Sequence, residues 1–249
     1  MTAPVFLLDR PDDPPLTGPG SVVLTGPEGR HAVSVRRMRV GEEIVLTDGA
    51  GTAAYGTVAH PEGKDRLEVT VTRVRTEPEP RPRITVVQAL PKGDRGELAV
   101  ETMTETGVDA IVPWRASRCI TQWRGDRGAK SLAKWRATAR EAAKQSRRLR
   151  VPHIAEPATT GHLATLLSRA DFAAVLHEEG AAPLAGAHLP EAGELVLVVG
   201  PEGGVSPEEL RTFAEAGARP HRLGPTVLRT STAGTAALAL LLSRTGRWA

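Results

Sequence analysis

Residues 194–204 read Glu-Leu-Val-Leu-Val-Val-Gly-Pro-Glu-Gly-Gly, and this stretch decides the fold class. The run Leu195–Val199 is apolar at every position, which is typical of a strand covered on both faces in a parallel sheet. A glycine turn follows the run. The next residues, Ser206–Glu209, give a helix start with a serine cap, proline at the first helical position and glutamate at the third. Buried strand, turn and capped helix together predict an α/β domain with a parallel sheet.

The same alternation of strand and helix extends on both sides of this stretch. Further short apolar runs predict strands at Ile84–Leu90, Ala110–Trp114 and Phe172–Leu176. Asp94 is positioned to cap a helix, with Glu97 completing a capping box and Gly107 ending it. An Ala-rich segment, Thr232–Arg244, predicts the last helix.

The first third of the chain has a different pattern. Short runs rich in Val and Thr, broken by Gly or Pro, predict strands within 21–26, 43–51, 53–59 and 67–75. Such brief strands indicate a small β-barrel, with one helix-like insertion at His31–Arg39. Three prolines in Thr76–Arg83 favour extended chain. We therefore expect a barrel domain at 1–75, a linker at 76–83 and an α/β domain at 84–249.

Composition excludes several classes of protein. The chain has 249 residues, of which 40% are hydrophobic and 24% charged, values that describe a globular protein rather than a disordered one. No apolar run approaches a membrane span, and the first residues lack the basic and apolar regions of a secretory signal. The single cysteine, Cys119, excludes an intramolecular disulfide and a cysteine-based zinc cluster. We expect a cytoplasmic protein without a metal site.

The positive charge is concentrated in one region. The net charge is only +3, yet twelve basic residues lie between Arg115 and Arg150, against two acids, Asp126 and Glu141. Residues 129–148 predict an amphipathic helix, with Leu132, Trp135, Ala139, Ala142, Ala143 and Ser146 on its apolar side. The other side carries Lys130, Lys134, Arg136, Arg140, Lys144, Arg147 and Arg148. A solvated face is one interpretation, but solvated faces mix signs, so this one indicates contact with nucleic-acid phosphates.

Two loops have the composition of a ligand site. They are Gly200–Gly204 and Leu223–Thr230, the second leading into the last helix. Glycine lets a backbone approach a ligand closely, although a structural turn would explain the first loop about as well. Neither loop carries the G-x-G-x-x-G or P-loop fingerprint, which disfavours a conventional dinucleotide or ATP site.

GPEGG after a hydrophobic strand, followed by LGPTVLRT before an Ala-rich helix, resembles the SPOUT superfamily of RNA methyltransferases. Within it, the sequence is most similar to the 16S ribosomal RNA (uracil-N3) methyltransferase family. The similarity extends over nearly the whole chain. The blocks that carry it include His31, Val35, Arg37, Gly41, Asp48-Gly49 and Gly51, then Pro91–Arg95, Glu105–Gly107, Pro113, Ser117–Cys119, Glu141–Ser146 and Val151-Pro152.

The resemblance implies a PUA-like β-barrel, a SPOUT domain with a parallel sheet and a trefoil knot, and a homodimer. It also implies S-adenosylmethionine bound in a bent shape among three loops. By position, the cofactor residues are Leu176, His177, Glu178, Val199, Gly200, Pro201, Glu202, Gly203, Gly204, Leu223, Gly224, Val227, Leu228 and Thr230. The implied reaction is methylation of N3 of a uridine in 16S rRNA of the small subunit.

For the chemistry, Arg229 is the candidate catalytic residue, since a guanidinium beside the cofactor loop suits charge developing on uracil. A dimer-interface or helix-start ion pair is its structural alternative. Glu202 and His177 are candidates for the base by position only. The expected RNA contacts are His31, Arg37, Lys92, Arg95, Arg136, Arg140, Lys144 and Arg147.

Two positions depart from the family pattern, and they keep a non-enzymatic function open. Thr226 stands where the family usually has Arg, and Ser231 where it usually has Glu. The enzymatic alternative is a SPOUT methyltransferase acting on a ribose 2′-hydroxyl. The non-enzymatic alternative is an RNA-binding ribosome assembly factor that has lost turnover.

Overall fold

The computed structural model describes residues 3–8 and 12–248. Contacts divide the chain into two compact units, Met1–Glu79 with Ala143–Val151, and Pro80–Ala142 with Pro152–Ala249. Within the described ranges, none of the helices combines the length and apolar character that a membrane span requires.

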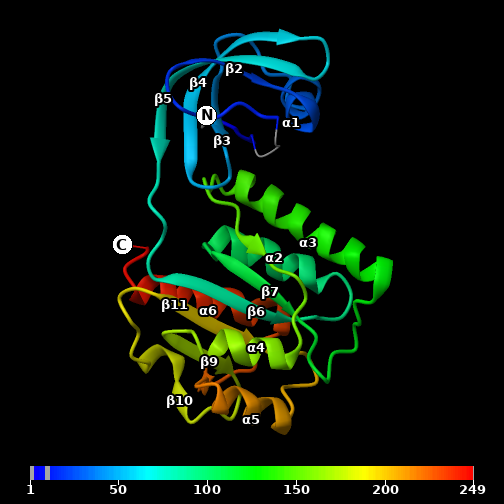
Figure 1. Cartoon of the computed structure of the whole chain (residues 1–249), viewed down its shortest axis with the longest axis vertical. Coiled ribbons are helices and arrows are strands. Elements are labelled where there is room, and N and C mark those ends of the chain that lie inside the picture. The colour runs from blue at the N-terminus through cyan, green and yellow to red at the C-terminus, as the bar shows by residue number, and fades with distance from the viewer. Residues whose placement is uncertain (1–2, 9–11, 249) are drawn as a thin grey trace. The chain divides into compact units, whose positions relative to one another are not determined.

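The first unit is built on a mixed sheet (Figure 1). Its strands are β1 (Val5–Leu7), β2 (Gly20–Leu24), β3 (Glu43–Thr47), β4 (Thr52–Glu62) and β5 (Arg66–Thr76), in the spatial order β1-β3-β4-β5-β2. β1 and β3 are parallel, and the other pairs are antiparallel. In the first half of β5 every second residue is buried, at Leu67, Val69 and Val71, so this part of the strand turns one face to the core. The small β domain predicted from the short strands is confirmed.

The helix-like insertion of this unit lies earlier than predicted. Helix α1 (Gly26–Arg30) begins directly after β2 and continues into a π-helical turn, η1 (His31–Val35). Pro27 stands in the first turn, where a missing N–H is tolerated, and this favours a start at Gly26. Arg37 has a φ of 54°, which ends the helical geometry before the predicted limit at Arg39.

A segment distant in sequence completes the first unit. The hydroxyl of Thr47 and the N–H of Gly51 both donate to the carbonyl of Leu149, over 3.1 and 3.0 Å. The Val151 N–H donates to the carbonyl of Gly49 over 2.9 Å. These bonds place Ala143–Val151 with the first unit, whereas the sequence had assigned all of 84–249 to one domain.

The second unit contains a seven-stranded, fully parallel sheet, as the apolar runs predict. Its strands are β6 (Arg83–Ala89), β7 (Ala110–Trp114), β8 (His153–Ile154), β9 (Phe172–Leu176), β10 (Ala182–Pro183), β11 (Glu194–Val199) and β12 (Arg219–Arg222), in the order β10-β12-β9-β11-β6-β7-β8. Its helices are α2 (Arg95–Thr106), α3 (Gly125–Gln145), α4 (Thr160–Leu167), α5 (Pro207–Glu215) and α6 (Thr230–Arg244), with a 3-10 turn, η2 (Leu184–Gly186). The knot depends on how loops thread one another, and it stays a prediction.

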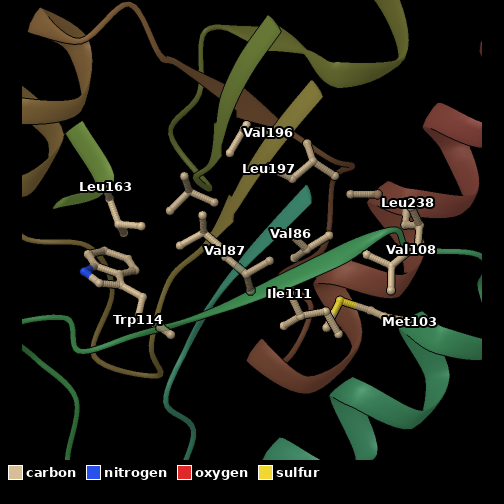
Figure 2. Close-up of a cluster of buried hydrophobic side chains, with 14 of the residues drawn as sticks. Val86, Val87, Met103, Val108, Ile111, Trp114, Leu163, Val196, Leu197 and Leu238 are labelled. Atoms are coloured by element: carbon tan, nitrogen blue, oxygen red, sulfur yellow. The ribbon is translucent and has the colours of Figure 1, made fainter. Parts of the chain in front are cut away.

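The central strands are covered on both faces. Figure 2 shows Met103 of α2 and Leu238 of α6 on one side of the sheet, and Trp114 and Leu163 on the other. Leu195–Val199 are all essentially buried, as a doubly covered strand requires. The capping box at α5 is also present, with the Ser206 hydroxyl accepting the Glu209 N–H.

The capping box predicted for α2 is wrong. Asp94 occupies the N-cap position, but its side chain accepts no cap hydrogen bond. Glu97 forms an ion pair with Lys134 of α3 instead, at 3.2 Å, so the side chain that should complete the box is engaged by another helix.

Helix α3 has the predicted amphipathic character with shifted limits. It spans Gly125–Gln145 rather than 129–148. The predicted apolar positions from Leu132 to Ala143 are buried. The end comes early because Arg147 has a φ of 60°. The N–H groups of Arg147 and Arg148 return to the carbonyls of Lys144 and Ala143, which is a Schellman ending.

Candidate cofactor site and RNA contacts

A cavity of about 590 Å³ lies where the second sheet's strands end. Three loops enclose it, following β9, β11 and β12, so segments far apart in sequence meet at one edge of a parallel sheet. All the cofactor residues named from the sequence line it, from Leu176, Val199 and Leu223 to Thr230. The geometry thus gathers the three predicted loops around one space of the size that small-molecule sites have.

The loops are bonded to one another at the floor of the cavity. The Thr230 hydroxyl donates to the carbonyl of Gly200 over 3.1 Å. The fully buried Gln88, the penultimate residue of β6, donates its Nε2 to the carbonyl of Thr230 over 3.3 Å. Through these two bonds, the start of α6 is fixed against the first residue of the glycine turn.

The loop after β9 holds His177 in one orientation. Its Nδ1 accepts the backbone N–H of Glu179 over 3.2 Å, and the backbone N–H of His177 donates to the carbonyl of His221 over 3.0 Å. The bond from Glu179 occupies the Nδ1 lone pair and fixes the orientation of the ring. A role for His177 as a base stays a prediction. Glu202 retains one carboxylate oxygen beyond the one that accepts the Lys92 N–H at 3.2 Å.

The charge around the cavity is predominantly positive. Arg95, Arg118, Arg222 and Arg229 line it, against Glu178 and Glu202. Sequence reasoning missed Arg118 and Arg222 as cavity residues. Their positions in the sequence could have indicated this, because Arg118 follows β7 and Arg222 ends β12. The carboxyl ends of parallel strands meet at one edge of the sheet, where the cavity lies.

Arg229 is exposed and immediately precedes α6, where it is the N-cap residue. A cation is electrostatically unfavourable at a helix N-terminus, so helix stability does not explain it. Among the described residues its side chain forms no ion pair, which leaves the helix-start ion pair without support. Of the two positions that depart from the family pattern, Thr226 lines the cavity, whereas Ser231 is buried behind it.

The expected RNA residues of the second unit fall into two groups. Lys92 is exposed beside the cavity, and Arg95 contributes to its wall. Arg136 is already engaged, with Glu156 at 2.9 Å and the Ile154 carbonyl at 3.2 Å. Arg140 is half-buried, and this burial lowers the pKa of its guanidinium despite the opposing charge of Glu141.

In the first unit, one expected RNA contact is wrong. Lys144 is buried, with a side chain 7% exposed, and its Nζ lies 2.9 Å from Glu28 Oε1. The helical wheel placed it on the basic side, but the last turn of α3, from Ala143, belongs to the first unit, in which α1 supplies a carboxylate. His31 packs its ring edge-on against Phe6 at 5.6 Å. Arg37 and Arg147 remain exposed.

Comparison with known proteins identifies the family. A model of the RNA methyltransferase domain matches residues 77–242, and one of the RNA methyltransferase PUA domain matches 24–72. Ribosomal RNA small subunit methyltransferase E of Mycobacterium bovis is 46% identical over all of this chain and 94% of its own length. This chain belongs to the ribosomal RNA small subunit methyltransferase E family. The Bacillus subtilis member is 30% identical, over 89% of this chain and 90% of its own.

Solved structures of this family share the fold. The enzyme of the same name from Neisseria gonorrhoeae, bound to S-adenosylmethionine, is 31% identical, with a TM-score of 0.85 over 98% of both chains. A methyltransferase from Legionella pneumophila, also in complex with that cofactor, is 26% identical, with a TM-score of 0.83 over 98% of both chains. The whole chain, including both units, therefore has the family architecture.

Proposed function

We propose that this chain methylates N3 of a uridine in 16S rRNA, with S-adenosylmethionine as the methyl donor. The observation that carries the proposal is that three separate loops meet around one cavity in a chain of this family. In this proposal the barrel at 1–75 contacts RNA, 76–83 connects it, and 84–249 provides the reaction. Because its substrate is ribosomal, the enzyme works in the cytoplasm.

The residues present fit the cofactor. The cavity offers backbone groups of Gly200–Gly204 and Leu223–Thr230, with apolar side chains at Leu176, Val199 and Leu223. A Cβ added at Gly224 would have no atom within 4 Å, so this part of the wall leaves open space. Bound there, S-adenosylmethionine supplies the methyl group.

The chain's own residues then prepare the uracil. N3 becomes a good nucleophile only when its proton passes to a base, a role for which the second carboxylate oxygen of Glu202 is available in the cavity wall, and negative charge then spreads over the ring. Arg229 stabilises that charge, because a guanidinium stays protonated and offers planar donors. The bonds joining Gly200, Thr230 and Gln88 keep the loop that carries Arg229 in a fixed position before the RNA arrives.

The first unit supports RNA binding through backbone geometry. Arg37 and Arg147 are the non-glycine residues with positive φ within the described ranges, at 54° and 60°. Glycine would hold either position at lower conformational cost, so helix ending alone does not explain arginine there. We assign both to RNA phosphates, together with His31 of the first unit and with Lys92, Arg95, Arg136 and Arg140 of the second.

The enzyme is further proposed to act as a homodimer. In the loop after β12, Val227 is 76% exposed and Leu228 39%, which leaves two apolar side chains in water beside the cavity. A second copy of the chain covering them would remove that surface from solvent. Sedimentation velocity of the purified protein tests the state directly.

Two measurements separate this proposal from its alternatives. Mass mapping of nucleosides in 16S rRNA from a strain lacking the protein should show loss of one 3-methyluridine, whereas loss of a 2′-O-methylated nucleoside would favour the ribose methyltransferase. Calorimetry with S-adenosylmethionine should show saturable binding. A protein that binds rRNA but not the cofactor would be an assembly factor.

A further inference from the structure

Arg118 reaches from the loop after β7 to the glycine turn of the cavity. Its Nη1 donates to the carbonyl of Gly203 over 3.1 Å, and its side chain contributes to the cavity wall. A Cβ added at Gly203 would lie 3.1 Å from the Arg118 Cβ and 3.3 Å from its carbonyl oxygen. The two loops are therefore in direct contact at this point.

A buried carboxylate fixes the backbone next to Arg118. Glu209 of α5 is 4% exposed. Its Oε1 accepts the Ser117 N–H over 2.7 Å and the Thr160 hydroxyl over 3.3 Å, while its Oε2 accepts the Ser206 N–H over 3.0 Å. The Glu209 side chain thus holds both Ser117, the residue before Arg118, and Ser206, which follows the glycine loop. These hydrogen bonds fix the backbone position of Arg118.

The loop after β6 joins the same assembly. The Thr121 hydroxyl donates to the carbonyl of Pro91 over 2.8 Å, and the Lys92 N–H donates to Glu202 over 3.2 Å. Since β11, β6 and β7 are neighbours in the sheet, their loops form one bonded rim on the side of the cavity that carries Lys92, Arg95 and Arg118.

The cavity wall carries more cations than the carboxylate of the cofactor requires. S-adenosylmethionine has one carboxylate, but four arginines line the cavity. The other ligand in the proposed reaction is an RNA strand, whose target base must leave its stack to reach the cavity, bringing its own phosphates to the mouth. A guanidinium matches phosphate with paired donors, and Arg118 uses only Nη1 among the described residues.

We propose that Arg118 binds an RNA phosphate adjacent to the target nucleotide while its Nη1 holds the glycine turn. This inference rests on the proposed function. Arg118 is then a substrate-binding residue that also positions the turn, so one side chain contacts the RNA and holds the loop that lines the cofactor site.

The test compares Arg118→Ala with Arg115→Ala, since Arg115 is an exposed arginine of the same loop that does not line the cavity. The KM for an rRNA fragment is measured at several salt concentrations, and the cofactor Kd by calorimetry. For Arg118→Ala we expect the KM to rise about tenfold, in line with loss of a charge-assisted bond. The plot of log(1/KM) against log salt concentration should become shallower by about 0.7–0.9, as expected when one phosphate contact is lost. Arg115→Ala should leave both near the wild-type values.

Arg118→Gln separates the two roles, because an amide can still donate to Gly203 but carries no charge. The salt dependence of its KM for RNA should be reduced as much as in Arg118→Ala, while its cofactor Kd should equal that of the wild type. If the salt dependence is unchanged and cofactor binding is weaker, Arg118 only holds the glycine turn. If the Arg115 and Arg118 variants have equal effects, Arg118 contributes only general positive surface charge. Either result overturns the inference, whereas a wild-type protein that methylates no RNA would overturn the proposed function itself.

Discussion

The two units of the molecule hold their cations by different means. In the first unit, Lys144 is buried against Glu28, and Arg37 and Arg147 are held in left-handed backbone. In the second, Arg118 and Arg229 extend from loops into the wall of a cavity. The first arrangement fixes charge through the folding of the barrel, while the second leaves charge free to meet a ligand. Substitutions of these first-unit cations should therefore change stability, alone at Lys144 and together with RNA binding at Arg37 and Arg147, whereas those at Arg118 and Arg229 should change binding and rate.

The largest expected effect is on stability, at Lys144. Lys144→Met removes the buried cation that lies 2.9 Å from Glu28, so unfolding in urea should show a loss of about 3–5 kcal/mol. Lys130→Met, at an exposed lysine of the same helix, is the matched control and should change stability by less than about 0.5 kcal/mol. Similar small losses for both variants would mean that the buried pair does not stabilise the first unit.

Lys144 also shows where sequence reasoning stops. Helical periodicity correctly predicted which residues of α3 face the core, because that depends only on local spacing. It could not reveal that the helix ends beside Glu28, a residue 116 positions earlier in the chain. The same limit applies to Ala143–Val151, whose bonds to Thr47, Gly49 and Gly51 no local pattern encodes.

The candidate site was more predictable than the tertiary contacts. Leu195–Val199 and the Ser206 cap were evident locally, and the family resemblance supplied the three loops that line the cavity. Arg118 was missed, since its contribution depends on β7 lying next to β6 in the sheet. The failed cap at Asp94 has a similar cause, because Lys134 of another helix engages Glu97.

The next effect in size concerns Arg229. If it stabilises charge on uracil, Arg229→Ala should lower the single-turnover rate by ~10²–10³, or roughly 2.7–4 kcal/mol, with little change in cofactor affinity. Arg229→Lys should restore only part of the rate, because an ammonium lacks the planar fork. Arg211→Ala, at an exposed arginine of α5 paired with Glu208, serves as the control.

A dimer-interface role for Arg229 predicts a different result. The alanine variant would then sediment as a monomer, and higher protein concentration would restore its activity. A dimeric Arg229→Ala protein with wild-type turnover would remove this residue from the catalytic machinery.

A smaller effect is expected at Gly203, where the two loops touch. In Gly203→Val the new side chain must displace Arg118, whose Cβ lies 3.1 Å from the added atom. We expect the cofactor Kd to rise at least about tenfold, equivalent to about 1.4 kcal/mol, with an unchanged unfolding midpoint. Gly161→Val is the control, because nothing lies within 4 Å of an added Cβ there. A Gly203→Val protein with the wild-type Kd would show that the turn adapts without affecting the site.

The smallest effect tests the first unit's strained arginines. Arg37→Gly and Arg147→Gly each relieve left-handed backbone, which costs roughly 1–2 kcal/mol in residues with a Cβ, against the greater entropy that glycine has in the unfolded chain. Each should therefore raise the free energy of unfolding by about 0.5–1 kcal/mol. At the same time, each should lower the salt slope of RNA binding by about 0.7–0.9, because a phosphate contact is lost.

Alanine at the same positions separates charge from backbone strain. Arg37→Ala and Arg147→Ala remove the same guanidinium but keep a Cβ at φ values of 54° and 60°, so they should match the glycine variants in RNA binding without any gain in stability. If the glycine variants gain stability and bind RNA like the wild type, these arginines end their helices and nothing more. If instead stability rises as RNA affinity falls, the chain accepts strained backbone in order to present arginine at these two sites, and the first unit contributes directly to binding the substrate.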